Sequence, residues 1–361
     1  MRILQLCSLT TFGGGERHVV DLSRGLNDLG HDVYAAAVTG SKLWTELSFL
    51  DRARFFALSR LNYVKNVAGL AGFVRAHDIE IVHAHAARDY HLASMVVRMA
   101  LRGRLVLTRH ALFSLRGINK YVLSNAVRVI AVSRAVAESL ARNDVIESSK
   151  IIVVHNGVDP DAFKGFGARG VDMPIRVGTV GHLAPIKGQD IFLRAAALLS
   201  ARRHDVQFVV IGEDKSPEKK HRMSLEKLVA ELDLNRIVTF AGWRDDMAAM
   251  LSSLDVFVSA ARSEPFGLAI VEAMAAGLPV VTTASAGALE IIEDGLNGKL
   301  ISAWDHHSLA AAINNLLKDP LERSRLGHNA KATVRERFSL TRMARETERV
   351  YREVLAADKG T

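Results

Sequence analysis

Short apolar runs alternate with helical patterns along almost the whole chain. In the first half these runs are continuous, which predicts strands that are buried on both faces. The predicted strands are Ile3–Cys7, Val33–Val38, Ile79–His83, Leu105–Thr108, Val127–Val132 and Ile151–Val154. Helices are predicted between them, for example over His18–Leu29, Leu92–Leu101 and Arg134–Arg142. Buried strands that alternate with helices indicate a parallel sheet with helices on both sides.

The second half repeats this plan. Its predicted strands are Ile175–Val180, Gln207–Ile211, Val238–Phe240, Val256–Ser259, Pro279–Thr282 and Lys299–Ile301. Helical patterns lie between them, for example over Asp190–Ser200 and Leu225–Leu232. After Asp305 the pattern is helical almost to the end, with one break at Phe338-Ser339. The predicted fold class is therefore α/β, with two doubly wound, Rossmann-like halves.

The stretch between the halves, Asp159–Pro174, is rich in Gly and Pro and has no periodicity, which is typical of a linker. This divides the chain into a domain over 1–165, a domain over 174–338 and a final helix over 339–361. In doubly wound sheets, ligands bind beyond the carboxyl ends of the strands. We therefore expect the two domains to face a common cleft, with functional residues directly after strands.

One stretch of the second half places carboxylates in an apolar setting. Ser263–Pro279 predicts a buried helix that starts near Gly267 and ends at Gly277, with Glu264 before it and Glu272 within it. Eight residues of helix separate the two carboxylates by about 12 Å. The acid and nucleophile of a retaining glycosidase lie only about 5 Å apart. The spacing therefore favours two contacts along one elongated polar ligand over hydrolysis.

Composition narrows the class of protein. The chain of 361 residues is 49% hydrophobic and 24% charged, as in globular proteins, and no apolar run is long enough for a membrane span. The net charge is +8, and almost all of the excess lies in the first half, which suits an anionic partner. No nucleic-acid-binding motif is present in the sequence. The single Cys7 and the absence of a signal peptide predict a cytoplasmic protein.

Glycine and histidine motifs follow the strands of the first half. Gly13-Gly14-Gly15-Glu16 comes after the first strand and opens a helix, where backbone N–H groups can approach an anion. His83 and His85 flank Ala84, and we expect them to point to opposite faces of the sheet. His110 follows another strand. These histidines are either structural or catalytic, and no cysteine or histidine cluster has the sequence spacing of a zinc site.

A possible phosphate-binding motif opens the second half. Lys187-Gly188 lies just past a strand, at a helix start, and offers a point charge and oriented N–H groups to a diphosphate. The alternative is a solvated lysine. His182 lies five residues earlier, and a loop with Trp243-Arg244 follows a later strand.

The pattern Glu264 to Glu272, with seven residues between, resembles the E-x7-E signature of the retaining GT-B glycosyltransferases of family 4. E-P-F-G-L and E-A-M-A-A-G-L-P-V-V around it match that family closely. The resemblance implies two domains facing a cleft and a final helix that returns to the first domain. It also implies that Glu264 binds the donor sugar, that Glu272 binds the ribose, and that the N–H groups of Phe266, Gly267 and Leu268 face the donor.

Other matches extend the resemblance to most of the chain. The G-G-x-E element implies that Gly14 and Gly15 lie near the donor phosphates, and His110 matches a histidine that faces the reacting sugar. Lys187 matches the diphosphate-binding lysine, but His182 replaces the family's arginine. Histidine is charged only below about pH 6.5, so we expect donor affinity to fall as pH rises, unlike in an arginine-bearing relative.

Two further loops also match the family. The loop with Arg244 is implied to lie near the nucleotide base. Ser285–Glu290 approximates the family's G-G-x-x-E turn, with one glycine replaced by alanine. The resemblance implies that His110, Glu264 and Lys187 are the catalytic residues. It also implies that the enzyme uses no metal ion and no cofactor.

The resemblance predicts a retaining hexosyltransferase that moves a sugar from a UDP- or GDP-sugar to a glycan or lipid-linked acceptor. Bacterial cell-surface polysaccharide or lipopolysaccharide synthesis is the expected setting. Leu112–Asn125 mixes apolar residues with Arg116 and Lys120, so it is either a packed helix or a segment that contacts an anionic inner membrane surface. The alternatives are a GT-B sugar-nucleotide epimerase and a non-catalytic polyanion-binding protein.

Overall fold

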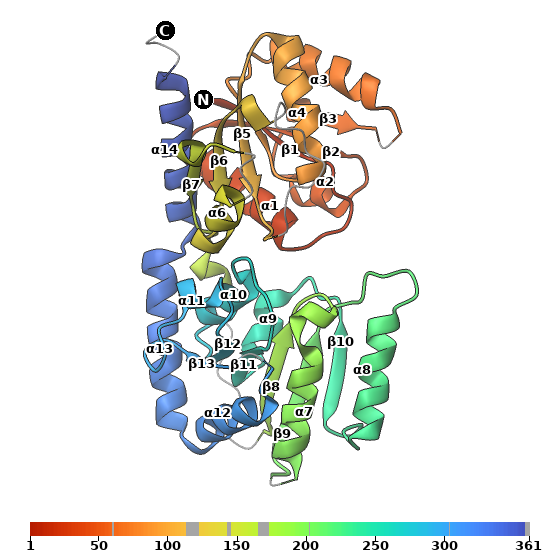
Figure 1. Ribbon diagram of the computed structural model, residues 1–361, viewed down its shortest axis with the longest axis vertical. Helices are drawn as coiled ribbons and strands as arrows, with labels where there is room; N and C mark the ends of the chain where they lie inside the picture. Colours follow the sequence, from red (N-terminus) through yellow and green to blue (C-terminus); the bar gives the residue numbers. More distant parts are fainter. Residues whose placement is uncertain are drawn as a thin grey trace. The chain divides into compact units, whose positions relative to one another are not determined.

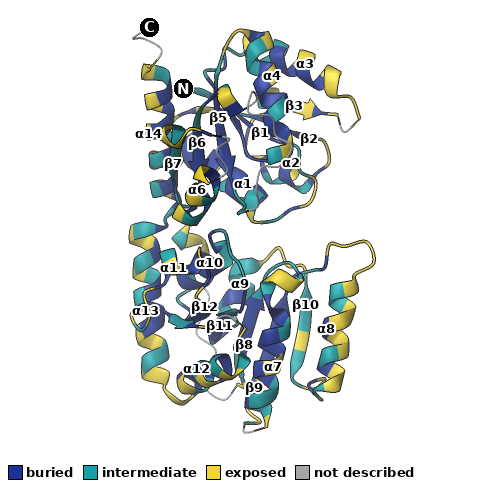
Figure 2. Ribbon diagram, in the orientation of Figure 1, coloured by how far each residue is buried: buried dark blue, intermediate teal, exposed yellow. Residues whose placement is uncertain are grey.

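The computed structural model describes residues 1–59, 61–112, 123–142, 146–164, 173–201, 203–302 and 304–357. The chain forms two compact units (Figure 1). The first unit comprises Met1–Gly157 together with the stretch from Leu340 onwards, and the second comprises Val158–Ser339. In both, the central strands are buried, the edge strands are partly exposed, and most exposed residues lie on outer helix faces and in loops (Figure 2).

The first unit contains a parallel sheet with the strand order β3-β2-β1-β4-β5-β6-β7. Its strands are β1 (Arg2–Cys7), β2 (Asp32–Val38), β3 (Phe55–Leu58), β4 (Ile81–Ala84), β5 (Arg104–Arg109), β6 (Ala126–Ala131) and β7 (Ile151–Val153). Six of these match predicted strands. The seventh, β3, was not predicted because it is a short edge strand that begins directly after the charged Arg52–Arg54 turn.

Helices cover this sheet and include the last helix of the chain. They are α1 (Gly14–Asp28), α2 (Lys42–Glu46), α3 (Tyr63–Ala76), α4 (Tyr90–Ala100), α6 (Arg134–Ala141) and α14 (Leu340–Ala356), with 3₁₀ turns over Arg52–Arg54, Ala87–Asp89 and Ser148–Lys150. Helix α14 packs on α1, where Gly25 is needed because a Cβ there would lie 2.8 Å from the Cβ of Ala344. The final helix is thus part of the first unit.

The core of the first unit joins α14 to the sheet by a polar contact as well as by apolar packing. Tyr351, on α14, is fully buried, and its hydroxyl lies 2.6 Å from Nδ1 of His83 on β4. Nε2 of the same imidazole lies 2.6 Å from Oγ1 of Thr108 on β5. Both ring nitrogens of His83 are therefore paired, as a buried polar side chain requires.

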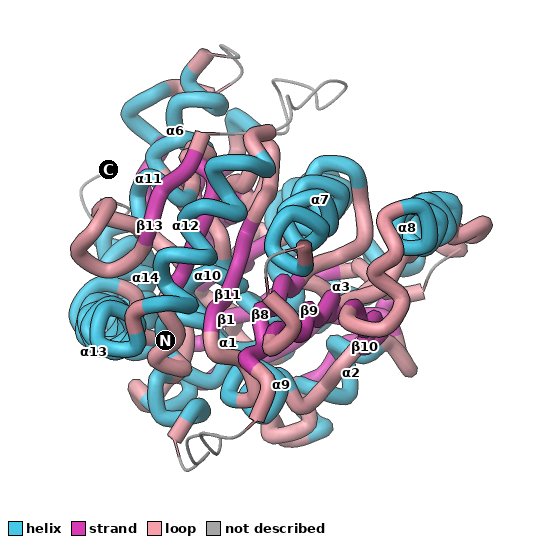
Figure 3. The backbone as a smooth tube through the Cα atoms, turned by 90° about the horizontal axis from the view of Figure 1, so that it is seen from below, coloured by secondary structure: helices cyan, strands magenta, loops and turns pink. Residues whose placement is uncertain are grey.

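The second unit contains a parallel sheet with the order β10-β9-β8-β11-β12-β13. Its strands are β8 (Ile175–Val180), β9 (Val206–Ile211), β10 (Val238–Gly242), β11 (Val256–Ser259), β12 (Val280–Thr283) and β13 (Lys299–Ile301), so all six predicted strands are present. Its helices are α7 (Gln189–Ser200), α8 (Lys220–Glu231), α9 (Met247–Ser252), α10 (Leu268–Ala275), α11 (Ala288–Ile291), α12 (His306–Lys318) and α13 (Pro320–Arg337). Helix α7 packs between α8 and α12 (Figure 3).

The border between the units differs from the predicted one at residue 165. The amide of Val158 donates to the carbonyl oxygen of Phe338 at 3.0 Å, so the chain pairs with the second unit directly after Gly157. The 3₁₀ turn Pro160–Phe163 then packs against α9, α10 and α13. Residues 158–164 therefore belong to the second unit, and the rest of the predicted linker up to residue 172 lies outside the described residues.

Within the described part of the chain, no helix is both long and apolar enough to cross a bilayer. Most of the segment Leu112–Asn125, for which a membrane contact was considered, falls at residues 113–122 and lies outside the described residues.

Candidate functional site

An ion pair marks the carboxyl ends of the central strands in the second unit. Nζ of Lys187 donates to Oε2 of Glu264 at 2.7 Å, and the two side chains are 28% and 14% exposed. Lys187 lies in the 3₁₀ turn Pro185–Lys187 that follows β8, and Glu264 lies in the loop between β11 and α10. Since β8 and β11 are neighbours in the sheet, residues 77 positions apart meet there. The pair is partly open, so a ligand can reach both charges.

Glycines hold the two loops of this pair against backbone atoms. Gly188 has φ +67°, and a Cβ there would lie 1.9 Å from the carbonyl oxygen of Ala260 at the end of β11. Gly287 donates its amide hydrogen to the carbonyl oxygen of Glu264 at 3.0 Å. A Cβ at Gly287 would lie 2.6 Å from that oxygen and 2.3 Å from the oxygen of Phe266. The Ser285–Glu290 turn therefore approaches the Glu264 backbone closely through Gly287, although one glycine of the family's turn is alanine here.

Helix α10 begins directly after Glu264. Gly267 is its N-cap residue with φ +114°, a conformation that favours glycine, and the helix start presents N–H groups that have no partner within the helix. The side chain of Phe266 is buried against Phe338, so only its backbone is placed to meet a ligand. Leu268 and Glu272 are half-buried on the first turns of the helix. The loop and helix thus offer a carboxylate and amide donors side by side.

His182 lies in the loop after β8 and stacks on an aromatic side chain. Its ring centroid is 6.1 Å from that of Trp243, with 20° between the planes, and Nζ of Lys215 lies 4.8 Å above the indole. Burial, together with the nearby Lys215 and Lys187 cations, lowers the pKa of His182 to about 4. The imidazole of the free protein is therefore neutral between pH 6 and 8, which argues against the expectation that its charge tunes donor affinity near neutral pH.

Arg244 does not join the Lys187 group. Its guanidinium donates to both carboxylate oxygens of Asp246 at 2.8 and 2.6 Å, and the side chain is 42% exposed. The neighbouring Trp243 is the residue of this loop that stacks on His182. No role was predicted for Trp243 from the sequence.

A pocket of about 600 Å³ lies beyond the carboxyl ends of β8, β9 and β10. Leu183, Gly212, Asp214 and Gly242 line it, together with residues at the start of α8. Asp214 is fixed as an acceptor, because its carboxylate receives the amide hydrogens of Ser216, His221 and Arg222. The pocket lies along the same sheet edge as the Lys187–Glu264 pair, since both follow the carboxyl ends of neighbouring strands. The polar residues that line the pocket were not predicted from the sequence.

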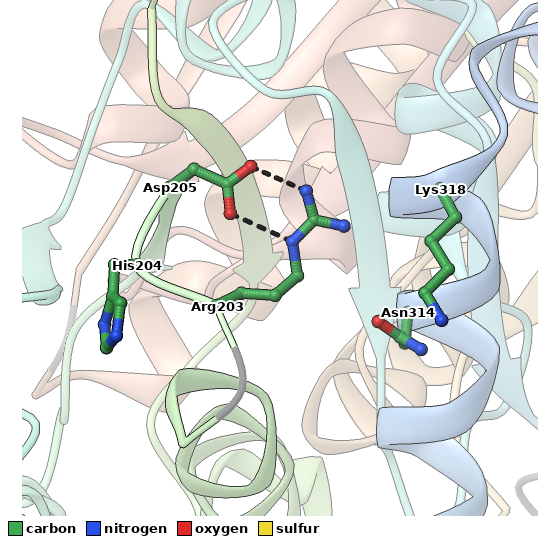
Figure 4. A pocket seen from close by; sticks show the side chains of 5 residues that line it. All are labelled: Arg203, His204, Asp205, Asn314 and Lys318. Carbon is green, nitrogen blue, oxygen red and sulfur yellow. Dashed lines mark hydrogen bonds and ion pairs between the residues drawn. The ribbon is translucent and has the colours of Figure 1, made fainter.

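A larger pocket of about 730 Å³ lies at the other end of the same sheet (Figure 4). Arg203, His204 and Asp205, which precede β9, face Asn314 and Lys318 of α12 across it. The guanidinium of Arg203 already donates to Asp205 at 2.9 and 2.6 Å. Since ligands of doubly wound sheets bind at the carboxyl ends of the strands, this hollow is not the candidate site.

Three histidines meet at the carboxyl ends of adjacent strands in the first unit. His18 lies on α1 after β1, His85 follows β4, and His110 follows β5. The ring centroids of His18 and His110 are 4.7 Å apart, and those of His18 and His85 are 5.5 Å apart. Gly15 adjoins His110, since a Cβ there would lie 3.9 Å from its ring. Gly14 and Gly15 form the first turn of α1, and Glu16 caps it by accepting from the amide of Gly13 at 2.8 Å.

Burial lowers the pKa of each of these imidazoles. The pKa of His18 falls to about 4, and those of His85 and His110 lie well below the usual value because of burial and then of the neighbouring histidines. One expectation needs correction. The rings of His83 and His85 lie 4.1 Å apart, on one face, because residues two apart in a strand share a face. The three-histidine cluster was not predicted, because its members lie far apart in the sequence and no zinc-site spacing marks them.

Comparison with known proteins covers both units. Residues 12–162 match the family Glycosyltransferase Family 4, and residues 168–333 match Glycosyl transferases group 1. The MMP alpha-(1->4)-mannosyltransferase of Mycolicibacterium hassiacum is 28% identical over 98% of this chain and 98% of its own. The phosphatidyl-myo-inositol mannosyltransferase of Mycolicibacterium smegmatis is 28% identical over 99% and 95%. The structure of Anabaena HepE in complex with UDP-glucose has a TM-score of 0.83 at 23% identity, covering 99% of this chain and 100% of that one.

Proposed function

The chain belongs to glycosyltransferase family 4 and has the GT-B fold, and we propose that its donor is a nucleotide diphosphate-sugar. The sugar passes, with retention of configuration, to a glycan or lipid-linked acceptor. The observation that carries this proposal is the Lys187–Glu264 pair at the strand ends of the second unit. It combines a cation for the diphosphate with a carboxylate for sugar hydroxyls.

Each residue of this group has a separate task. Lys187 binds the leaving diphosphate and neutralises the charge that grows on it, an electrostatic contribution that is often the largest in catalysis. Glu264 and the N–H groups at Phe266, Gly267 and Leu268 orient the sugar. Glu272, on the same helix, binds the ribose. A lysine and amide donors supply this stabilisation without a metal ion at the diphosphate.

The nucleotide base occupies the pocket beyond β8, β9 and β10. The stacked His182 and Trp243 border the loops that line it and offer flat surfaces to a planar ring. His182, being neutral, contributes a hydrogen bond rather than charge to the phosphates. Arg244 has its guanidinium bound to Asp246, so a contact to the base requires that this pair opens.

Retention follows from attack on the face that the diphosphate leaves. As the bond from the anomeric carbon to the phosphate oxygen breaks, that oxygen takes the proton of the acceptor hydroxyl, and the new glycosidic bond forms on the same face. This route needs no covalent nucleophile. His110 and the Gly14–Gly15 turn of the first unit are assigned, by the family resemblance, to the reacting sugar and the donor phosphates.

The acceptor is the least constrained partner. Most of the net positive charge lies in the first half of the chain, which suits an anionic or phosphate-bearing acceptor. One relative of this chain is named as a phosphatidyl-myo-inositol mannosyltransferase. We place the protein in the synthesis of a bacterial surface glycan, such as lipopolysaccharide, with contact to an anionic membrane surface.

The test begins with thermal stability against UDP-, GDP-, ADP- and TDP-sugars and the free nucleotides. A ligand at about 100 times its Kd raises the unfolding free energy by about 2.7 kcal/mol, so one base family should stand out. Glu264→Ala should then abolish transfer of labelled sugar while keeping the circular dichroism of the wild type. Near-normal turnover in this variant refutes the assignment, and a new sugar nucleotide made from donor alone identifies an epimerase instead.

A further inference from the structure

We propose that His18, His85 and His110 form a binding site for a divalent transition metal ion, preferably zinc, in the first unit. One nitrogen of each imidazole can be chosen so that the three lie within 4.8 Å of one another. The three residues come from the ends of β1, β4 and β5, which are neighbours in the sheet, so the backbone fixes their convergence. The site uses no residue of the second unit, but it shares His110 with the group assigned to the reacting sugar.

Unpaired polar atoms point to a ligand at this place. His18 and His85 are 3% and 4% exposed. Nδ1 of His85 and Nε2 of His110 have no hydrogen-bond partner among the described residues, and His18 has at most one, the side chain of Asn156, which leaves at least one of its ring nitrogens unpaired. A buried polar atom without a partner is destabilising, and at least three of them in one place are costly unless something binds there. These nitrogens are the atoms that a metal ion would use.

The surroundings of His85 resemble those of a metal ligand. Nε2 of His85 lies 2.6 Å from Oε1 of Gln5, an oxygen that can only accept, so this nitrogen carries the proton. The lone pair is then on Nδ1, the unpartnered nitrogen. A second ring nitrogen that donates to a carbonyl is the usual way in which proteins orient a ligating histidine. His83 is excluded as a ligand, because Tyr351 and Thr108 occupy both of its nitrogens.

The chemical type of the three ligand atoms determines which metal ion would bind. Three imidazoles suit zinc, cobalt, nickel or copper, whereas magnesium and calcium prefer oxygen ligands. Zinc binds imidazole nitrogen at about 2.0–2.1 Å, so the three rings must move closer when the ion enters. Three protein ligands leave the fourth position of a tetrahedral ion for water or a hydroxyl group. Lys187 still stabilises the leaving diphosphate without a metal ion. The proposal therefore changes only the expectation that the protein binds no metal at all.

The test uses untagged full-length protein that has been freed of metal with EDTA. Titration with Co²⁺ should give the visible absorption bands of a tetrahedral site at one ion per chain, and Zn²⁺, but not Mg²⁺, should displace it. His85→Ala and His18→Ala should weaken binding by more than about 100-fold, because a direct ligand matters more than its orienting partner. Gln5→Met should weaken it about 10- to 100-fold. His204→Ala, at an exposed position, should bind as the wild type does.

The proposal is overturned if the folded wild type binds no ion, or if His85→Ala and His18→Ala bind as tightly as the wild type. It is also overturned if His204→Ala is the variant that loses binding. Should the histidine variants fail to fold, X-ray absorption at the zinc edge of the wild-type complex decides. Three imidazole nitrogens support the site, and an oxygen-only shell rejects it. Lys187→Ala should leave metal binding intact, which separates this site from the donor site.

Discussion

Gly287 donates its amide hydrogen to the carbonyl oxygen of Glu264 at 3.0 Å, and no room for a side chain exists between them. The backbone of Gly287 has φ −70° and ψ −37°, which any residue adopts. The glycine is therefore needed for close contact rather than for an unusual conformation. One loop, 23 positions further along the chain, holds the proposed sugar-binding carboxylate in place.

Gly287→Ala is expected to lower kcat by about 100-fold, because displacement of a positioning group by about 1 Å has an effect of this size. The new Cβ forces the backbone of Glu264 and Phe266 to move, so circular dichroism first checks that the variant is folded. Steady-state kinetics with the identified donor measure the change. Gly72→Ala is the matched control, as a Cβ there meets nothing within 4 Å on helix α3, and its activity should equal that of the wild type.

Lys187→Ala should reduce kcat by about 10²- to 10³-fold, the size found when one stabilising donor is removed from a developing negative charge. Lys187→Arg should recover part of the loss, because it keeps the charge but changes the geometry. Lys227→Ala, at an exposed position on helix α8 outside the pocket, serves as control. A variant with a higher KM and an unchanged kcat would show that Lys187 only binds the ground state.

His182 should make no contribution to the pH dependence of donor affinity between pH 6 and 8. Its pKa of about 4 lies below this range, so the ring gains a proton only when the pH falls toward 4. His182→Arg adds a permanent charge and should tighten nucleoside diphosphate binding, whereas His182→Gln should leave it unchanged. Calorimetry at pH 6, 7 and 8 tests both. A steady loss of wild-type affinity with rising pH, absent in His182→Gln, would contradict the prediction.

Tyr351→Phe should destabilise the first unit by about 1–3 kcal/mol, because it leaves Nδ1 of the fully buried His83 without a partner. Urea unfolding of the full chain, followed by fluorescence, measures the loss. Tyr63→Phe alters a tyrosine that is 51% exposed and should change stability by less than about 0.5 kcal/mol. Equal stability of Tyr351→Phe and wild type would mean that water or rearrangement replaces the lost hydroxyl.

The strands were predicted from the sequence more completely than the contacts between distant parts of the chain. Continuous apolar runs identified six strands in each half, because parallel strands buried on both faces leave a strong pattern. Strand β3 (Phe55–Leu58) is also an apolar run, but it is a short edge strand directly after the charged Arg52–Arg54 turn and was missed. The border at Gly157 was missed because it depends on the pairing of Val158 with Phe338, a contact between distant parts of the chain.

The sequence indicated which residues belong to the candidate site but not which of them lie in contact. Glu264 and Lys187 were each identified from local motifs, but their 2.7 Å contact follows from the adjacency of β8 and β11, which no local pattern contains. The histidine cluster was missed for the same reason. His85 would have been found on the same face as His83 by correct use of the two-residue strand period. Trp243 left no signal beyond its place after a strand.

The second unit is one uninterrupted segment, Val158–Ser339, whereas the first is made of two separated stretches of chain. During synthesis from the amino terminus, the sequence of the second unit is therefore complete before that of the first. The first unit stays open until α14 leaves the ribosome, because Tyr351 and its apolar neighbours on that helix are part of its core. A nascent chain without its last turns would therefore carry a complete second unit joined to a first unit whose core still lacks α14.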